Sequence, residues 1–183
     1  MMKSMSVRRM AFSAAVAAVY AALTMFLAPI SYGPLQFRMS EALCILPFFF
    51  PFTAWGLYVG CVIANLLSQF GILDVVFGSL ATLVAGLCSA WLGKKHPESW
   101  LRCVLSCLMP VVFNALIIGG IIALSTADPF NSAPLWLIFA ANALQVGLGE
   151  AVVMFAIGLP LMRILPKQPL FHTISHKIKG ESI

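Results

Sequence analysis

Carboxylates in apolar surroundings are the feature of this sequence with the clearest chemical meaning. Over residues 10–93 the only charged side chains are Arg38, Glu41 and Asp74, and Glu150 lies deep in a later apolar run. Inserting a carboxylate into a membrane costs about 3 kcal/mol unless a partner compensates it, so such groups usually serve a ligand, an ion or a proton. The sequence therefore predicts that these acids bind a cationic or donor-rich ligand. Asp74 has a structural alternative, because an acid at a helix N-terminus is stabilised by the helix dipole.

Amide side chains stand at the same places as the acids. Asn65 ends an apolar run, and Asn114 lies within another. At about 100° per residue, Asn142, Gln145 and Glu150 fall within an arc of about 140° on one helix. These amides could line a polar pocket or simply hold helices together. For Asn114, Asn142 and Gln145 both interpretations stay open.

The segment between the first two apolar runs combines aromatic and polar residues. Gly33 and Pro34 predict a turn, and Tyr32, Phe37 and Arg38 flank it. We expect this loop to cover the mouth of the pocket and to lie over a flat ring. The alternative is that Tyr32 and Phe37 are interfacial anchors of the kind common in membrane proteins.

Familiar catalytic and metal-binding motifs are absent. The sequence has no Gly-x-x-x-x-Gly-Lys-Ser/Thr phosphate loop, no His-Glu-x-x-His and no Gly-x-Ser-x-Gly. His172 and His176 lack a third ligand, so they are a weak metal signal. We expect neither an enzyme nor a bound metal or cofactor.

Composition places the acids in an integral membrane protein. The chain of 183 residues is 61% hydrophobic and 9% charged, with a mean hydropathy of +0.99. Five uncharged stretches of 19 to 32 residues lie between Arg9 and Glu150, and each is near or above the roughly 20 residues that cross a bilayer as a helix. The first run is too long for a signal-peptide core, so we expect it to remain as a helix. The predicted helices are 10–30, 41–52, 53–68, 71–93, 100–125 and 134–164.

The number of spans follows from the basic residues. If Glu41–Ser68 forms two short helices broken near Pro47 and Pro51, ten lysines and arginines lie on one side and Arg38 alone on the other. A single span there would violate the positive-inside rule. We therefore predict an all-α protein with six transmembrane helices, short second and third helices and both termini in the cytoplasm. Residues 1–165 would form one domain, and 166–183 a basic, solvated cytoplasmic tail. We therefore attribute the net charge of +5 to basic residues at the cytoplasmic ends of the helices and expect no binding of nucleic acid.

Two further patterns concern packing. Ala14, Ala18 and Ala22 repeat every four residues in the first helix, and a face of small side chains lets another helix approach closely. The cysteines all lie in apolar stretches, where they usually pack as small residues. They are Cys44, Cys61, Cys88, Cys103 and Cys107.

Several blocks of the sequence resemble the QueT family. The blocks are 27–43 (LAPISYGPLQFRMSEAL), 60–68 (GCVIANLLS), 74–83 (DVVFGSLATL), 113–119 (FNALIIG) and 149–150 (GE). Members of this family are substrate-binding S components of energy-coupling factor transporters, linked to uptake of queuosine precursors. The resemblance implies a six-helix protein of the bacterial plasma membrane. It would capture its ligand from outside and dock through its alanine-rich first helix on a membrane scaffold subunit. Two cytoplasmic ATPase subunits would hydrolyse ATP.

The ligand implied by this resemblance is a 7-deazaguanine such as 7-aminomethyl-7-deazaguanine. Its ammonium arm suits a carboxylate, and its N1–H and exocyclic amine can donate two parallel hydrogen bonds to another. Its carbonyl oxygen needs a donor, and its ring could stack on an aromatic side chain such as Trp55. Which carboxylate meets which edge stays open. The predicted substrate-binding residues are Tyr32, Phe37, Arg38, Glu41, Trp55, Asn65, Asp74, Asn114, Asn142 and Glu150.

Two other classes of function compete with this one. A proton-coupled secondary transporter could use Glu41 or Glu150 to carry the proton, although such folds usually contain two related halves and no internal repeat is visible here. A membrane assembly protein without a ligand could pair its acids with Arg38. Uptake by the chain alone under a proton gradient would favour the secondary transporter. An absence of saturable ligand binding would favour the assembly protein.

Overall fold

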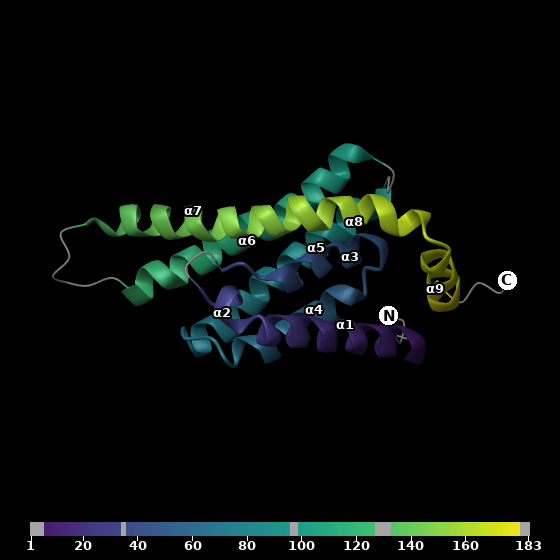
Figure 1. Ribbon diagram of the computed structural model, residues 1–183, viewed down its shortest axis with the longest axis horizontal. Coiled ribbons are helices and arrows are strands. Elements are labelled where there is room, and N and C mark those ends of the chain that lie inside the picture. Colours follow the sequence, from purple (N-terminus) through teal and green to yellow (C-terminus); the bar gives the residue numbers. More distant parts are fainter. Residues whose placement is uncertain (1–5, 34–35, 96–98, 127–132, 180–183) are drawn as a thin grey trace, which may run out of the picture.

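Every regular element of the computed structural model is a helix among the residues that it describes, 6–33, 36–95, 99–126 and 133–179 (Figure 1). The first half contains α1 (Val7–Phe26), α2 (Ala28–Ser31), the 3₁₀ helix η1 (Met39–Ile45), α3 (Leu46–Phe49), α4 (Thr53–Asn65) and the π-helix η2 (Asp74–Gly78). The second half contains α5 (Ser79–Lys95), α6 (Trp100–Thr126), α7 (Leu135–Val153), the π-helix η3 (Met154–Gly158), α8 (Leu159–Ile164), the 3₁₀ helix η4 (Leu165–Lys167) and α9 (Pro169–Lys179). The predicted all-α class is confirmed.

Four helices are long and apolar enough to span a bilayer, where six spans were predicted. They are Val7–Phe26, Asp74–Lys94, Trp100–Thr126 and Leu135–Lys167. Met39–Phe49 and Thr53–Asn65 are apolar but shorter than the roughly 20 residues that a span needs. The stretch from Glu41 to Asn65 is broken at Pro51, as expected from a proline that cannot continue a helix. The predicted short second and third helices are thus present.

Glycines allow the helices to pack closely in two pairs. A Cβ at Gly56 or Gly60 of α4 would collide with the backbone of Ser13 or Ala17 in α1. A Cβ at Gly119 of α6 would lie 2.6 Å from the Cα of Ala143 in α7. Glycine therefore brings the backbones of α1 and α4, and of α6 and α7, into direct contact, as small residues do in membrane bundles. Figure 1 shows α6 and α7 as the long upper pair and α1 along the lower edge.

Sulfur and aromatic side chains fill much of the core. Tyr20, Cys44, Leu57, Cys61 and Met154 are fully buried in one hydrophobic cluster. All five cysteines are free thiols. Cys61, Cys103 and Cys107 are buried in this cluster, as predicted for packing residues.

The tail after Lys167 differs from the predicted solvated segment. Its described part forms α9, which packs its apolar side against the rest of the chain: the Phe171 ring lies 5.2 Å from that of Phe49, and Ile178 is buried. Arg8 and Arg9 of α1 donate to the carbonyl oxygens of Lys177 and Ile178, at 3.2 and 3.4 Å. The helix is amphipathic. The prediction of a solvated tail rested on the polar and basic composition of the whole segment, which hides the apolar residues on one side of the helix.

Candidate functional site

A group of polar side chains lies inside the helix bundle, shielded from the surface. We call it the polar centre and define it as Arg38, Glu41, Asn65, Asp74, Asn114 and Glu150. Each member is at most 6% exposed. All six were predicted as site residues, and they come from five separate parts of the chain.

Helix ends and irregular helices position most of these groups. Arg38 directly precedes the 3₁₀ helix η1, and Glu41 lies in its first turn. Asn65 is the last residue of α4, and Asp74 is the first residue of the π-helix η2. A second π-helix, η3, begins four residues after Glu150. Single π turns inside α-helices are frequent at functional sites because they redirect side chains.

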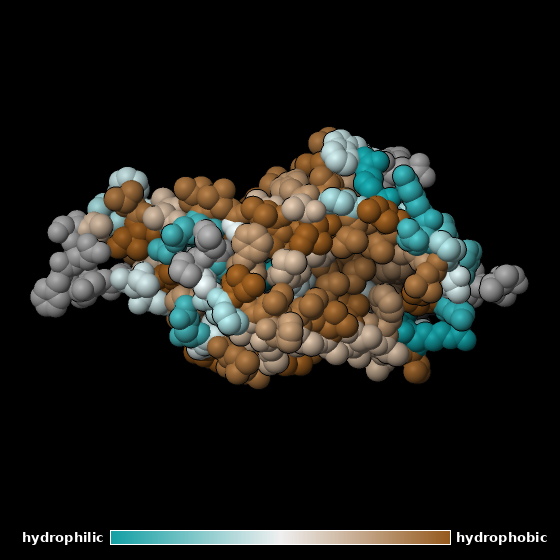
Figure 2. All heavy atoms as spheres, in the orientation of Figure 1, coloured by the Kyte–Doolittle hydropathy of each residue, from teal (hydrophilic) through white to brown (hydrophobic). Residues whose placement is uncertain are grey.

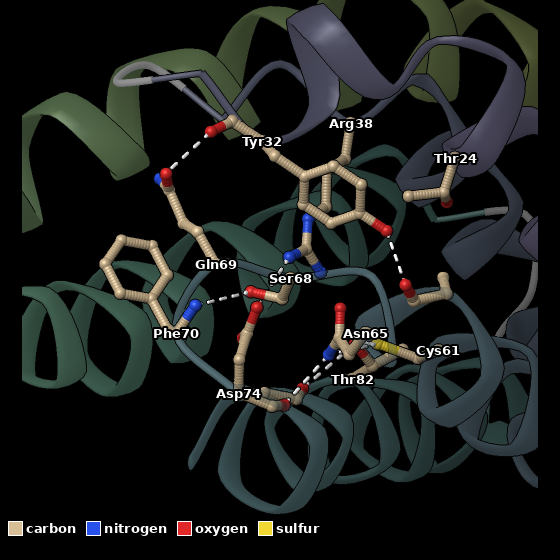
Figure 3. A network of polar contacts seen from close by, with 12 residues as sticks. Thr24, Tyr32, Arg38, Cys61, Asn65, Ser68, Gln69, Phe70, Asp74 and Thr82 are labelled. Carbon is tan, nitrogen blue, oxygen red and sulfur yellow. Dashed lines mark hydrogen bonds and ion pairs between the residues drawn. The ribbon is translucent and has the colours of Figure 1, made fainter. Parts of the chain in front are cut away.

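Arg38 and Asp74 form a buried ion pair at one side of the polar centre (Figure 3). The Arg38 Nη2 to Asp74 Oδ2 distance is 3.2 Å. Asn65 Nδ2 donates to the backbone oxygen of Asp74 at 2.9 Å. Gly78 makes room for this arrangement, since a Cβ there would collide with Asp74 Oδ1.

Glu41 is held by two donors from the surrounding helices. The Tyr20 hydroxyl donates to Glu41 Oε1, and the Cys44 thiol donates to Oε2 at 2.9 Å. Beside them Thr24 and Ser40 share a hydrogen bond of 2.6 Å. Both oxygens of this carboxylate are therefore already engaged within the protein.

Glu150 has an unused carboxylate oxygen and, unlike Asp74, forms no ion pair among the described residues. Its Oε1 is buried and has no hydrogen-bond partner among the described residues. The Asn114 side chain approaches its carboxyl group, and the nearest charges that act on it come from Glu41 and Arg38. Removing a charge from water without a partner is costly. Glu150 is thus the least compensated member of the polar centre.

The charges of the polar centre do not balance. It contains three carboxyl groups and one cation, Arg38, and that cation is already paired with Asp74. Other buried polar atoms without a described partner face the same region, namely Arg38 Nε, Asn65 Oδ1 and Asp74 Oδ1. The arrangement can offer both acceptors and a donor to a polar ligand.

Tyr32 links the loop after α2 to this centre. Its hydroxyl donates to the carbonyl oxygen of Ala64, and its own carbonyl accepts from Gln69 Nε2 at 3.3 Å. The Arg38 guanidinium lies 5.6 Å from the centre of its ring, within the range of a cation–π contact. Figure 3 shows the ring lying across the guanidinium, on the other side of it from Asp74. Pro34 of the predicted turn lies outside the described residues.

Two predicted residues, Trp55 and Asn142, are not brought to the polar centre. Trp55 stands near the opposite end of α4 from Asn65, 55% exposed, with its ring against Tyr58. Asn142 donates to the carbonyl of Ile138 within its own helix, at 2.8 Å. Phe37 is half-buried next to Arg38.

Tyr20 and Cys44 are site residues that sequence reasoning missed. Tyr20 is fully buried in α1, on a helix that had been interpreted through its alanines. The available signal was its position: a phenol in the middle of an apolar span needs a hydrogen-bond partner.

The predicted docking face of α1 lies on the surface. Ala14, Ala18 and Ala22 are all exposed, whereas Ala17 and Ala21 are buried. The buried side of α1 faces Gly56 and Gly60 of α4. The alanine stripe is therefore not used for packing inside this chain.

Within the described parts of the chain, no three His, Cys, Asp or Glu side chains are grouped as metal ligands. Three cavities formed by described residues also lie away from the polar centre. They lie at the ends of α3, α6 and α8, between α1 and α9, and between α6 and α7.

Comparison with known proteins places these features in a family. Over 73 residues the chain is 49% identical to the queuosine precursor transporter QueT of Lactococcus lactis subsp. cremoris (strain MG1363). That alignment covers 39% of this chain and 43% of the relative, so less than half of the relative is matched. No solved structure matches the chain. The family model described as QueT transporter matches residues 10–167, which include the whole polar centre and the exposed face of α1. This chain is a membrane protein of the QueT transporter family.

Proposed function

We propose that this chain is the substrate-capture subunit of an ATP-driven importer of the energy-coupling factor type, in the bacterial plasma membrane. Its polar centre binds a 7-deazaguanine queuosine precursor, such as 7-aminomethyl-7-deazaguanine, from outside the cell. The observation that carries this proposal is the buried Oε1 of Glu150, which has no hydrogen-bond partner among the described residues. A cationic ligand supplies the missing donor and the missing positive charge together.

The ligand and the polar centre are chemically complementary. The ammonium arm pairs with Glu150, whose neighbour Glu41 adds to the negative field. The N1–H and exocyclic amine donate to Asp74 Oδ1 and Asn65 Oδ1, which have no described partner. The carbonyl oxygen accepts from Asn114 or from Arg38 Nε. Charge-assisted hydrogen bonds of this kind are about twice as strong as neutral ones.

Ligand entry requires side chains to separate, because each member of the polar centre is at most 6% exposed. Tyr32 is the group to move, since its hydroxyl bridges to Ala64 and its ring covers Arg38. In the bound state Tyr32 and Phe37 cover the flat ring. A water-filled or ligand-filled centre would also shelter the short helices η1–α3 and α4 at membrane depth.

Orientation follows from the distribution of charge. Arg8, Arg102, Arg163 and Lys167 lie at the end of the bundle that carries α9, and we call this the basic end (Figure 2). Arg38 lies in the polar centre, away from it. By the positive-inside rule the basic end is cytoplasmic. The two short helices then complete six passages through the bilayer.

Binding by the purified chain tests the proposal. Calorimetric titration with 7-aminomethyl-7-deazaguanine should show saturable binding, and Glu150→Gln should weaken it by about tenfold or more, since a hydrogen bond to a charged group contributes about 1.5–3 kcal/mol. Gln145→Ala, an exposed change on the same helix, is the matched control and should bind normally. An absence of saturable binding, or equal affinity in Glu150→Gln, would contradict the proposal.

Assembly is tested separately from binding. We propose that the exposed face of Ala14, Ala18 and Ala22 docks on a membrane scaffold subunit, which carries two cytoplasmic ATPases. Ala18→Trp should abolish co-purification with the scaffold subunit but leave ligand affinity unchanged. Val152→Trp, at another exposed position, should leave assembly intact. Normal assembly of Ala18→Trp would exclude this docking face.

Transport assays distinguish this subunit from a self-sufficient carrier. Vesicles that contain the chain alone should not accumulate the ligand under a proton gradient, because ATP hydrolysis on partner subunits supplies the energy. Accumulation under those conditions would favour the proton-coupled alternative.

A further inference from the structure

A cavity of about 570 Å³ opens at the basic end, far from the polar centre. Its largest apolar side chains are Phe48 and Phe49 of α3, Met162 of α8 and Phe171 of α9. Arg163 and Lys167 line the same cavity. One space therefore joins these apolar side chains to two cationic side chains.

The cationic side of this cavity is open to solvent, and no acid of the described residues compensates it. Arg163 and Lys167 are both exposed. No acidic residue lines the cavity among those described, because the three described acids, Glu41, Asp74 and Glu150, are all buried in the polar centre. The Arg163 guanidinium is held over the Trp100 ring, 4.4 Å from its centre, as a cation–π contact. An anion would meet a positioned positive charge here.

The cavity also lies at the depth of a membrane interface. Figure 2 shows hydrophilic side chains gathered at the basic end, where the apolar surface of the bundle stops. Trp100 is 53% exposed at this end, and exposed tryptophans concentrate at the level of lipid headgroups. Leu170 of α9 is exposed as well. At this level of a bilayer the cavity would face both the acyl chains and the headgroups of one leaflet.

We propose that this cavity binds an acidic phospholipid. The phosphate pairs with Arg163 and Lys167, and the beginning of an acyl chain lies against Phe49, Met162 and Phe171. A basic pocket between transmembrane helices is a known way to hold anionic headgroups. Free phosphate would satisfy the two cations but would leave the apolar side chains uncovered.

The bound lipid would also hold α9 in place. Phe171 forms one wall of the cavity and contacts Phe49 and Phe50, with ring centres 5.2 and 5.4 Å apart. A lipid between α8 and α9 bridges elements that otherwise meet through few side chains. Since a ligand that binds only the folded state stabilises it, the acidic lipid should raise the unfolding temperature.

Lipid titration of the full chain in a neutral detergent tests this proposal. Phosphatidylglycerol and phosphatidylcholine with identical acyl chains are added separately, and binding is followed by native mass spectrometry and thermal unfolding. Phosphatidylglycerol should bind about 30-fold more tightly, since each of the two basic residues near an anionic headgroup adds about 1 kcal/mol. The double variant Arg163→Gln/Lys167→Gln should lose this preference.

Matched controls separate a specific site from general surface charge. Arg8→Gln/Lys177→Gln removes two basic residues at the same end, which line a different cavity between α1 and α9, and it should keep the preference. Binding of 7-aminomethyl-7-deazaguanine is measured in every variant as a check of folding. Equal binding of the two lipids, retention of the preference in Arg163→Gln/Lys167→Gln, or its equal loss in both double variants would overturn the proposal. So would stabilisation by inorganic phosphate equal to that by phosphatidylglycerol.

Discussion

Arg38 and Arg163 carry the same guanidinium group in opposite environments. Arg38 is 4% exposed and pairs with Asp74 at 3.2 Å, whereas Arg163 is exposed at the basic end and lies over Trp100. A buried charge without a partner destabilises the folded protein, whereas an exposed charge is solvated by water and changes the free energy of folding little. The two regions therefore have different proposed roles: the polar centre would bind the ligand, and the basic end would set the orientation in the membrane and bind lipid.

The largest difference between the regions should appear when an arginine is removed from each. Arg38→Ala should lower the free energy of unfolding by about 3–5 kcal/mol, because it leaves Asp74 as a buried charge without its partner. Arg102→Ala, which removes a hydrogen bond of 3.3 Å to the Leu92 carbonyl at the basic end, should cost about 1 kcal/mol or less. Denaturant unfolding in detergent measures both.

The double variant Arg38→Ala/Asp74→Ala sharpens this test. Since both charges are then absent, it should recover part of the loss seen in Arg38→Ala. Equal destabilisation by Arg38→Ala and Arg102→Ala would mean that the ion pair contributes no more than a surface contact.

Packing around the polar centre should give the next largest effect. Gly78→Ala places a Cβ against Asp74 Oδ1 and 3.0 Å from Asn65 Nδ2, and overpacking typically costs about 1–3 kcal/mol. In Gly120→Ala the nearest atom, Phe139 Cε2, is 3.8 Å from the new Cβ. That control should be neutral or slightly stabilising, since alanine favours a helix over glycine by about 1 kcal/mol. Thermal unfolding measures both variants. A lower unfolding temperature for Gly120→Ala than for Gly78→Ala would contradict this prediction.

Loss of one donor to Glu41 should have a smaller effect. Tyr20→Phe removes the hydroxyl that donates to Glu41 Oε1 and should lower stability by about 1–2 kcal/mol, the usual cost of an unsatisfied buried acceptor. Tyr58→Phe, at a half-buried ring that packs on Trp55, should change stability by about 0.5 kcal/mol or less. If the two phenylalanine variants unfold alike in denaturant, the Tyr20–Glu41 hydrogen bond is not stabilising.

The smallest effect is expected for a contact at the basic end. Arg8→Gln removes an exposed hydrogen bond to the Lys177 carbonyl, so the midpoint of thermal unfolding should not change measurably. Backbone amides in the last turn of α9 should exchange faster with solvent, because that helix end loses one of its two described hydrogen bonds with α1. Unchanged exchange there would show that Arg8 does not hold α9.

Helix limits could be predicted from the sequence because charge gaps and prolines act locally. The predicted 100–125 corresponds to α6, and the predicted break near Pro51 separates α3 from α4. The six residues of the polar centre were also predicted, since a charge or amide in an apolar run stands out. Arg38 was identified as the cation for these acids, but its pairing with Asp74 depends on a contact between residues that are 36 positions apart.

Which face of each helix points into the bundle was harder to predict than the helix limits. A helix that is apolar on all sides gives no amphipathic pattern, and lipid-facing side chains resemble core side chains. Trp55 was therefore placed in the site although it faces outward. Asn142 satisfies its amide within its own helix, and no sequence pattern distinguishes that from an inward contact.

The contact of Arg8 and Arg9 with the end of α9 has a consequence for biogenesis. The two arginines leave the ribosome about 170 residues before the carbonyl groups that they bind. Because a chain grows at roughly 5–20 residues per second, the start of α1 waits many seconds in the nascent protein before this contact can form. Closure of the basic end is therefore a late event in synthesis, and a ribosome stalled before α9 would hold a bundle whose first helix still lacks its final neighbour.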